Sequence, residues 1–307
     1  MGITSEFGTS IFLVPERCGS AMLLKFFFLT FLFSWLLFAA VAATLHSAGD
    51  IPSATGPASL LFIPGAIIPS LVAIGLTARA QGRSGVLSLL KGITEWQRDV
   101  RWYAFAIGFF AVIKLAAAAI YRLSVGTWPL FGQVPWFLMA IAIVFSTPVQ
   151  AGEEIGWRAF ALPRMTKLFG LPAASVILGV IWASWHLPFF FIPGSDNFGQ
   201  SFWMYLIAVT AISVAMAWLY SRTNQSLLLV MIMHASIDNT AGIVTSPASA
   251  RLRNPFAFSA SPLAWLTVAV LWICAAYFLF RMRGHDLRVP IASPIETPAL
   301  QKPFLSA

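Results

Sequence analysis

The strongest constraint on this chain is a succession of long apolar runs, separated by short polar segments. A helix of about 20 apolar residues spans the hydrocarbon core of a bilayer, and it satisfies its backbone hydrogen bonds within the segment. The sequence therefore predicts an all-α, polytopic integral membrane protein with about eight transmembrane helices. The expected spans are about 22–45, 57–78, 102–121, 136–162, 170–193, 202–220, 226–244 and 262–281.

Composition supports a single membrane domain. Hydrophobic residues make up 59% of the chain and charged residues 10%, whereas soluble domains carry about 25% charged residues. No polar segment is long enough to bury a core of its own. We expect an N-terminal extension over 1–21, a transmembrane domain over 22–281 and a disordered cytoplasmic tail over 282–307. Translation can start at Met1 or at Met22, where the first apolar run begins.

The positions of lysine and arginine predict the topology. Fifteen of the 19 fall in segments that lie on the side of the N-terminus, while Arg122, Arg251 and Arg253 fall on the other side. Cytoplasmic loops carry the excess of positive charge, so we predict that both termini are cytoplasmic. The net charge of +8 is scattered singly through short loops. Because it forms no basic face, we expect no nucleic-acid partner. The remaining cation, Lys114, lies inside a span, where we expect it to snorkel.

Ionisable residues also occur within three other expected spans. Each charged side chain at the centre of a membrane helix costs about 2.5 to 3.5 kcal/mol, so such residues are candidates for function. The candidate site residues are Glu153, Glu154 and Arg158 on the fourth span, His186 on the fifth, and His234 and Asp238 on the seventh.

Helical spacing indicates how these residues can meet. Glu154 and Arg158 are four residues apart with the acid first, which is the favourable order for an ion pair. Glu153 lies about 100° around the helix and can face elsewhere. The predicted turn near position 170 is equidistant from Glu153 and His186, each roughly 25 Å along its helix from that turn. His234 lies at a similar depth, about 15 Å below the cytoplasmic surface, so spacing alone predicts convergence.

Such a cluster suits the activation of water and the polarisation of a carbonyl group. A buried glutamate can act as a general base, and imidazole groups can position the water or stabilise an oxyanion. If zinc is present, Glu153, His186 and His234 would supply three ligands and leave the fourth position for water. The sequence has no HExxH, GxSxG or GxGD motif, which argues against zincins, serine hydrolases and intramembrane aspartyl proteases.

A membrane transporter or a non-catalytic scaffold is the alternative hypothesis. Carboxylates and histidines at mid-bilayer also form proton relays in transporters. The expected spans show no inverted internal repeat, and the polar groups gather on three helices instead of lining a path across the membrane. These observations favour an enzyme.

Three motifs together carry a resemblance to a known family. They are EExxxR from Glu153 to Arg158, WxxxHLP around His186, and HxxxD from His234 to Asp238. In this order, on three separate spans, they resemble those of the CAAX-protease and bacteriocin-processing (CPBP) family. That family includes the Ras-converting prenyl-protein proteases and the ABI proteins of bacteria. The resemblance covers roughly residues 135–245.

The resemblance implies an intramembrane endopeptidase in a cell membrane, with a bacterial inner membrane as the expected location. Its substrate would be a membrane-associated protein or peptide, either a CAAX-type prenyl protein or a bacteriocin-like peptide. By this resemblance, Glu153 activates the attacking water together with His186. Glu154 and Arg158 support the geometry of the site, and His234 stabilises the oxyanion or binds a metal.

Two positions depart from the family pattern. The family usually has phenylalanine where Trp182 stands, and we expect little consequence from this exchange. Many members have asparagine where this chain has Asp238, and an ionised aspartate cannot donate a hydrogen bond to an oxyanion. Asp238 can be protonated, orient His234 or contact a metal, and we favour the orienting role.

Overall fold

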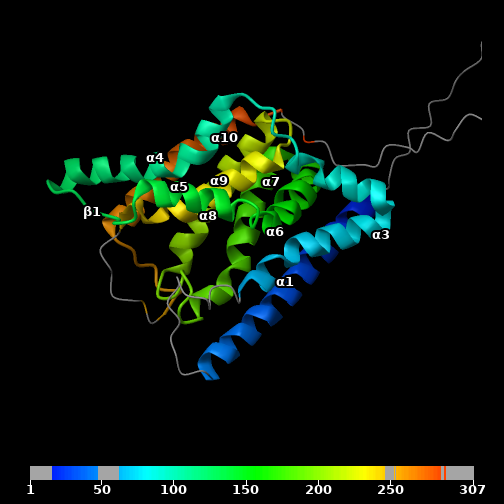
Figure 1. Ribbon diagram of the computed structural model, residues 1–307, viewed down its shortest axis with the longest axis horizontal. Helices are drawn as coiled ribbons and strands as arrows, with labels where there is room; N and C mark the ends of the chain where they lie inside the picture. The colour runs from blue at the N-terminus through cyan, green and yellow to red at the C-terminus, as the bar shows by residue number, and fades with distance from the viewer. Residues whose placement is uncertain (1–15, 48–61, 246–251, 253, 285–286, 288–307) are drawn as a thin grey trace, which may run out of the picture.

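The structure is a computed structural model that describes residues 16–47, 62–245, 252, 254–284 and 287. The described chain is helical apart from one short antiparallel strand pair, which confirms the predicted all-α class (Figure 1). The elements, in chain order, are α1 (Glu16–Ser47), α2 (Ile63–Ala66), α3 (Ile68–Leu90), η2 (Lys91–Ile93), α4 (Val100–Val125), β1 (Leu130–Phe131), α5 (Trp136–Ser146), α6 (Ala151–Glu154), η3 (Ile155–Ala161), α7 (Leu162–Trp185), η4 (Leu187–Phe190), α8 (Phe202–Arg222), α9 (Leu227–Thr240), η5 (Ala241–Ile243), β2 (Val244–Thr245) and α10 (Pro262–Arg281).

The protein is a multi-pass membrane protein. Six helices in the described part of the chain are long and apolar enough to cross a membrane. Two shorter apolar helices, Trp136–Ser146 and Leu227–Ile243, accompany them. The count of eight spans and the cytoplasmic position of the termini stay predictions.

The two ends of the membrane domain differ in how they match the expected boundaries. Helix α1 begins at Glu16, upstream of Met22, so the first helix starts inside the predicted N-terminal extension. Helix α10 ends at Arg281, the predicted boundary. Residues 1–15 and most of the predicted tail lie outside the described residues.

A helical hairpin runs from Ala151 to Trp185, and Gly170 reverses the chain near its middle. Gly170 has φ 74° and ψ 156°, a conformation that is open almost only to glycine. The two arms pack against each other, and the ring centroids of Trp157 and Trp185 lie 5.8 Å apart. The predicted turn between the fourth and fifth spans is therefore present.

The expected fourth span, 136–162, is not one continuous helix. Helix α5 ends at Ser146, and a turn over 147–150 contains Pro148, which has no N–H to continue the helix. Beyond Glu154 the chain widens into a π-helix, η3, which ends before Pro163. Because Pro163 cannot donate to the carbonyl four residues earlier, the regular helical ladder is interrupted there. The two glutamates thus lie at the start of a helical segment instead of within one.

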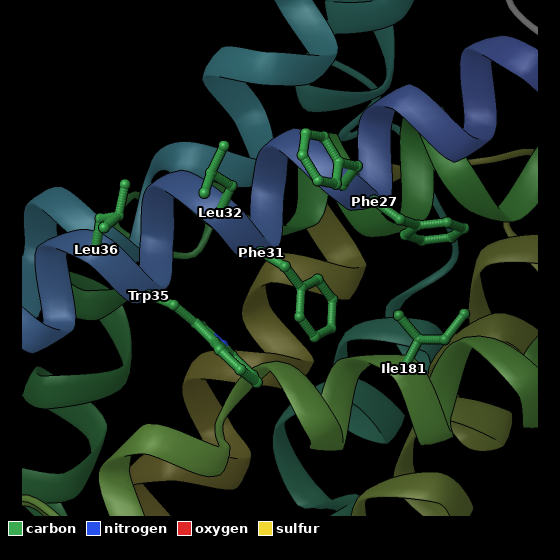
Figure 2. Close-up of a pocket in the computed structure, with 7 residues that line it drawn as sticks. Phe27, Phe31, Leu32, Trp35, Leu36 and Ile181 are labelled. Atoms are coloured by element: carbon green, nitrogen blue, oxygen red, sulfur yellow. The ribbon is translucent and has the colours of Figure 1, made fainter.

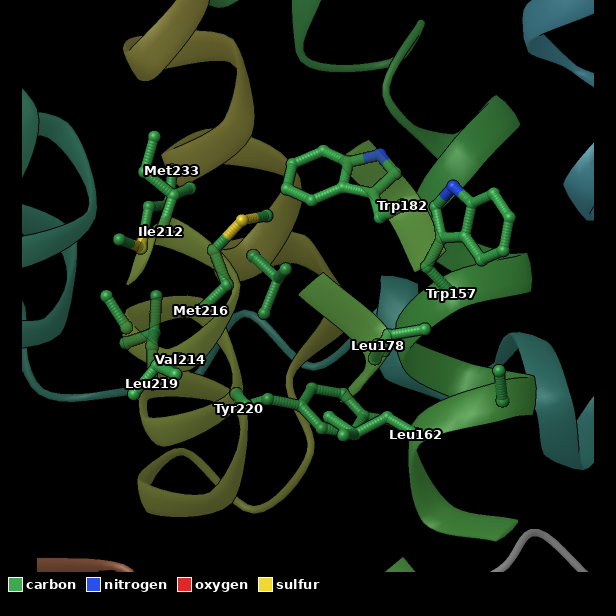
Figure 3. Packing of buried hydrophobic residues seen from close by; sticks show 14 of the residues in the cluster. Trp157, Leu162, Leu178, Trp182, Ile212, Val214, Met216, Leu219, Tyr220 and Met233 are labelled. Carbon is green, nitrogen blue, oxygen red and sulfur yellow. The ribbon is translucent and has the colours of Figure 1, made fainter. Parts of the chain in front are cut away.

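Small residues bring the central helices close together. A Cβ atom on Gly179 of α7 would lie 2.7 Å from the Cα atom of Thr210 on α8. Beside it, the hydroxyl of Ser213 donates a hydrogen bond to the carbonyl oxygen of Ser175, at 3.0 Å. Close backbone approach of this kind is typical of packed membrane helices. Figure 3 shows the apolar packing around this region, with Trp157 and Trp182 on neighbouring arms of the hairpin.

Candidate active site

The six predicted site residues lie where α6, η3, the end of α7 and α9 meet. Glu154 contacts Arg158 and His234 directly, Asp238 lies beside His234, and Trp182 links Glu153 and His186 to the others. Glu154 and Arg158 are fully buried, and Glu153 is 9% exposed. At the other end of the cluster, half of the Asp238 side chain is exposed, at 50%. The site therefore runs from a dry ion pair to an accessible carboxylate.

Glu154 is the centre of a buried charge network. Its Oε1 atom accepts a hydrogen bond from Nη1 of Arg158 at 2.8 Å, which is the predicted i, i+4 pair. The same oxygen lies 2.7 Å from Nδ1 of His234 on α9. Arg158 also directs Nη2 to the sulfur of Met216, at 3.3 Å. A buried charge is tolerated only when it is paired, so this network ties the hairpin to α8 and α9.

Glu153 has a different environment from its neighbour. Its Oε2 atom accepts a hydrogen bond from the indole Nε1 of Trp182, at 2.7 Å. Among the described residues, this is the only side-chain hydrogen bond to the carboxyl group of Glu153. Glu153 is thus held by one neutral donor, whereas Glu154 is enclosed in an ion pair.

The two histidines are fixed through the same ring nitrogen. Nδ1 of His186 lies 2.9 Å from the carbonyl oxygen of Trp182. Because a carbonyl oxygen only accepts, this Nδ1 carries the proton and Nε2 keeps its lone pair. His234 points its Nδ1 at the carboxylate of Glu154, so its Nε2 faces away from the ion pair. Each ring therefore presents Nε2 for chemistry.

Asp238 lies beside His234 without a direct hydrogen bond to it, so its predicted orienting role stays a prediction. Its Oδ2 atom is 3.9 Å from Nε2 of His234, which is longer than a hydrogen bond. Glu154 orients the imidazole from the opposite ring nitrogen. Asp238 accepts a hydrogen bond from Nε2 of Gln150, at 2.8 Å.

Two side chains near the site belong to none of the three motifs. Gln150 is 8% exposed and lies three residues before Glu153, so helical spacing alone could have placed it beside the acids. The ring of Tyr205 on α8 lies 5.5 Å from that of His186. The sequence carries no signal for Tyr205, because its position depends on how α8 packs against α7. Lys114 lies on α4, a helix that supplies none of the six candidate residues.

The predicted zinc ligands are not arranged as a metal site. In the described part of the chain, no group of three or more His, Cys, Asp and Glu side chains has the geometry to hold a metal ion. The hydrogen bonds described above use Nδ1 of His186, Nδ1 of His234 and Oε2 of Glu153, so Nε2 of each ring and Oε1 of the carboxyl group remain as potential donor atoms. Zinc binding stays a prediction, and the chemistry proposed below is derived from the side chains alone.

Comparison with known proteins gives two matches. Residues 133–240 match the family described as Type II CAAX prenyl endopeptidase Rce1-like. The CAAX prenyl protease 2 of Methanococcus maripaludis is 28% identical over 108 residues, which cover 33% of this chain and 37% of that relative. The matched part thus spans little more than a third of the relative. The family match contains all six candidate residues and Gln150.

Proposed function

We propose that this chain is an intramembrane endopeptidase, because residues 133–240 match the family described as Type II CAAX prenyl endopeptidase Rce1-like. It hydrolyses a peptide bond in a membrane-associated protein or peptide by means of an activated water molecule. The observation that carries this proposal is the contrast between the adjacent acids. Glu154 is enclosed by Arg158 and His234, while Glu153 accepts a hydrogen bond from one neutral donor, the indole of Trp182.

Glu153 is the general base of the proposed reaction. It takes a proton from a water molecule, whose oxygen forms a bond with the carbonyl carbon of the scissile peptide. Nε2 of His186 accepts the second hydrogen bond of that water, which holds the water in line for attack. When the carbon–nitrogen bond breaks, the proton on Glu153 passes to the leaving nitrogen. The products are a carboxylate and an amine.

His234 supports the negative charge that develops on the carbonyl oxygen. With Nδ1 anchored on the carboxylate of Glu154, a protonated Nε2 can donate a hydrogen bond to the oxyanion. The pair of Glu154 and Arg158 keeps the imidazole in this orientation. Gln150 fixes Asp238 at the exposed end of the site, where the substrate enters.

An apolar groove between α1 and α7 suits a substrate with a lipid tail. It has a volume of about 600 Å³, and its seven lining side chains are all apolar (Figure 2). Helix α1 supplies six of them and Ile181 of α7 the seventh. Ile181 directly precedes Trp182, the residue that contacts Glu153. An isoprenoid chain in this groove would anchor a CAAX-type peptide on the helix that carries Trp182, while a bacteriocin-like peptide is the other substrate class.

Cleavage by the purified protein tests the proposal. The full chain in liposomes is incubated with a prenylated CAAX peptide, the same peptide without its prenyl group, and a bacteriocin-like peptide. We expect release of the C-terminal fragment by the native chain and none by Glu153→Gln. Activity that survives chelators, with no metal in the sample, would support the metal-free mechanism. Failure to cut any of these peptides, together with a solute flux altered by Glu153→Ala, would favour a transporter.

The proposed location is the cell membrane, and specifically a bacterial inner membrane. The apolar helices require a bilayer, and the lysines and arginines are distributed as in proteins with cytoplasmic termini. Fractionation of cells that produce the native chain tests this location. Recovery of the protein in a compartment other than the inner membrane would contradict it.

A further inference from the structure

Trp182, the first residue of the WxxxHLP motif, contacts several of the candidate site residues. It is 3% exposed, and its Nε1 donates a hydrogen bond to Oε2 of Glu153 at 2.7 Å. Its ring meets that of His234 edge to face, with centroids 5.1 Å apart and an interplanar angle of 90°. Its carbonyl oxygen accepts from Nδ1 of His186. One residue therefore touches the proposed base and both imidazoles.

The face of the same indole covers the guanidinium group of Arg158. The central carbon of that group lies 4.1 Å from the ring centroid, which is the geometry of a cation–π contact. Arg158 is held between this face and the carboxylate of Glu154. The indole thus separates the positive charge from Glu153, while the hydrogen bond from its edge fixes one oxygen of that carboxylate. The other oxygen, Oε1, is left for the water.

We propose that Trp182 is the positioning residue that distinguishes the two adjacent glutamates in this chain. Its edge orients Glu153 as the base, and its face confines Arg158 to Glu154. A phenylalanine can fill the same space but has no N–H to donate. In this proposal, the presence of tryptophan at position 182 instead of the phenylalanine usual in the family adds a hydrogen bond to the base. The expectation from the sequence was that this difference has little consequence. This inference rests on the proposed peptidase function for its kinetic test, but not for its spectroscopic one.

The spectroscopic test follows the indole N–H proton itself. Tryptophan-labelled full chain in detergent gives one indole N–H resonance for each tryptophan, and Trp182→Phe identifies the resonance of Trp182. We expect this resonance to move upfield in Glu153→Ala, because its acceptor is gone. The resonance of Trp157, whose Nε1 has no hydrogen-bond partner among the described residues, should stay in place. An unmoved Trp182 resonance would overturn the inference.

The kinetic test compares two tryptophan-to-phenylalanine variants. Trp182→Phe and Trp157→Phe each remove one buried indole, but only the first removes a hydrogen bond. We expect Trp182→Phe to lower kcat by about tenfold to a hundredfold, the effect of losing a hydrogen bond to a charged group, with KM changed less than about twofold. Trp157→Phe should keep kcat close to the native value.

The outcomes separate the two hypotheses. Native kcat in Trp182→Phe, or an equal loss of kcat in both variants, would overturn the positioning role while the proposed function stands. A native chain without any peptidase activity would overturn the proposed function. In that case the resonance of Trp182 in Glu153→Ala still decides whether the indole holds this carboxylate.

Discussion

At the scale of single residues, two neighbouring glutamates have become chemically distinct through their partners. Glu153 accepts from a neutral indole, whereas Glu154 accepts from both Arg158 and His234 through one oxygen. The difference does not come from the sequence next to them, since they are adjacent. It comes from the roughly 100° turn between successive helical residues, which points them at different helices.

This difference predicts that glutamine at position 153 and glutamine at position 154 have different effects on stability. Glu153→Gln should abolish cleavage and leave the thermal unfolding midpoint unchanged, because no ion pair is lost. Glu154→Gln should lower the midpoint as well as kcat/KM, since breaking a buried pair costs about 3 to 5 kcal/mol. Thermal unfolding in detergent and peptide cleavage on the same samples measure both quantities. Equal and purely catalytic losses in the two variants would refute the division of roles.

A second prediction concerns the accessible carboxylate. Asp238→Asn should keep kcat/KM within about tenfold of the native value, because an amide oxygen can still accept from Gln150 and such a neutral exchange costs about 0.5 to 1.5 kcal/mol at most. Asp238→Leu removes this acceptor and should lower kcat/KM further. Steady-state cleavage rates distinguish the two variants. If Asp238→Asn were inactive, the negative charge itself would be required.

Local spacing predicts only part of this site. The pair of Glu154 and Arg158 follows from an i, i+4 relation, and it is present at 2.8 Å. The contact of Glu154 with His234 joins residues 80 positions apart, so it depends on how α9 packs. The hydrogen bond from Trp182 depends on the rotation of one hairpin arm against the other. Neither rotation nor packing can be read from hydropathy.

At the scale of elements, the hairpin turn depends on one glycine. Gly170 has φ 74° and ψ 156°, where a side chain is strained whatever space surrounds it. We predict that Gly170→Ala lowers the free energy of unfolding by about 1 to 3 kcal/mol. Gly108→Ala is the matched control, because that glycine lies in helix α4 with open space around it. The control should be neutral or slightly stabilising.

Denaturation of both variants in the same detergent measures the difference. A loss of stability in Gly108→Ala as large as that in Gly170→Ala would show that the turn is not special. Peptide cleavage should fall together with stability in Gly170→Ala, because the turn sets how Glu153 and Trp182 face each other.

Hydropathy predicted the helices well but the breaks poorly. The predicted reversal near position 170 is present, since Gly170 is followed closely by Pro172. The interruption at 147–150 and the π-helix over Ile155–Ala161 were not predicted. Apolar residues continue through both segments, so the average hydropathy along the chain does not reveal the interruption or the π-helix. Pro148 and Pro163 are the signals that mark these breaks in retrospect.

At the scale of the whole molecule, the topology remains the main prediction from charge. We expect a fluorescent reporter, one that matures only in the cytoplasm, to be bright when fused after Ala307. The same reporter inserted after Gly126, just beyond the end of α4 on the predicted outside, should stay dark. Fluorescence of intact cells measures both fusions. A dark C-terminal fusion with a bright loop insertion would reverse the orientation, while native cleavage activity in each fusion controls for misfolding.

The wide spacing of the site along the chain has a consequence for biosynthesis. The hydrogen bond between Trp182 and Glu153 closes over 29 residues, whereas that between His234 and Glu154 closes over 80. Chains emerge from the ribosome N-terminus first, so the hairpin can form before α9 exists. The oxyanion partner then arrives last. A nascent copy of this proposed peptidase is therefore inert until nearly all of its helices have entered the bilayer, and it cannot cut the membrane proteins being inserted beside it.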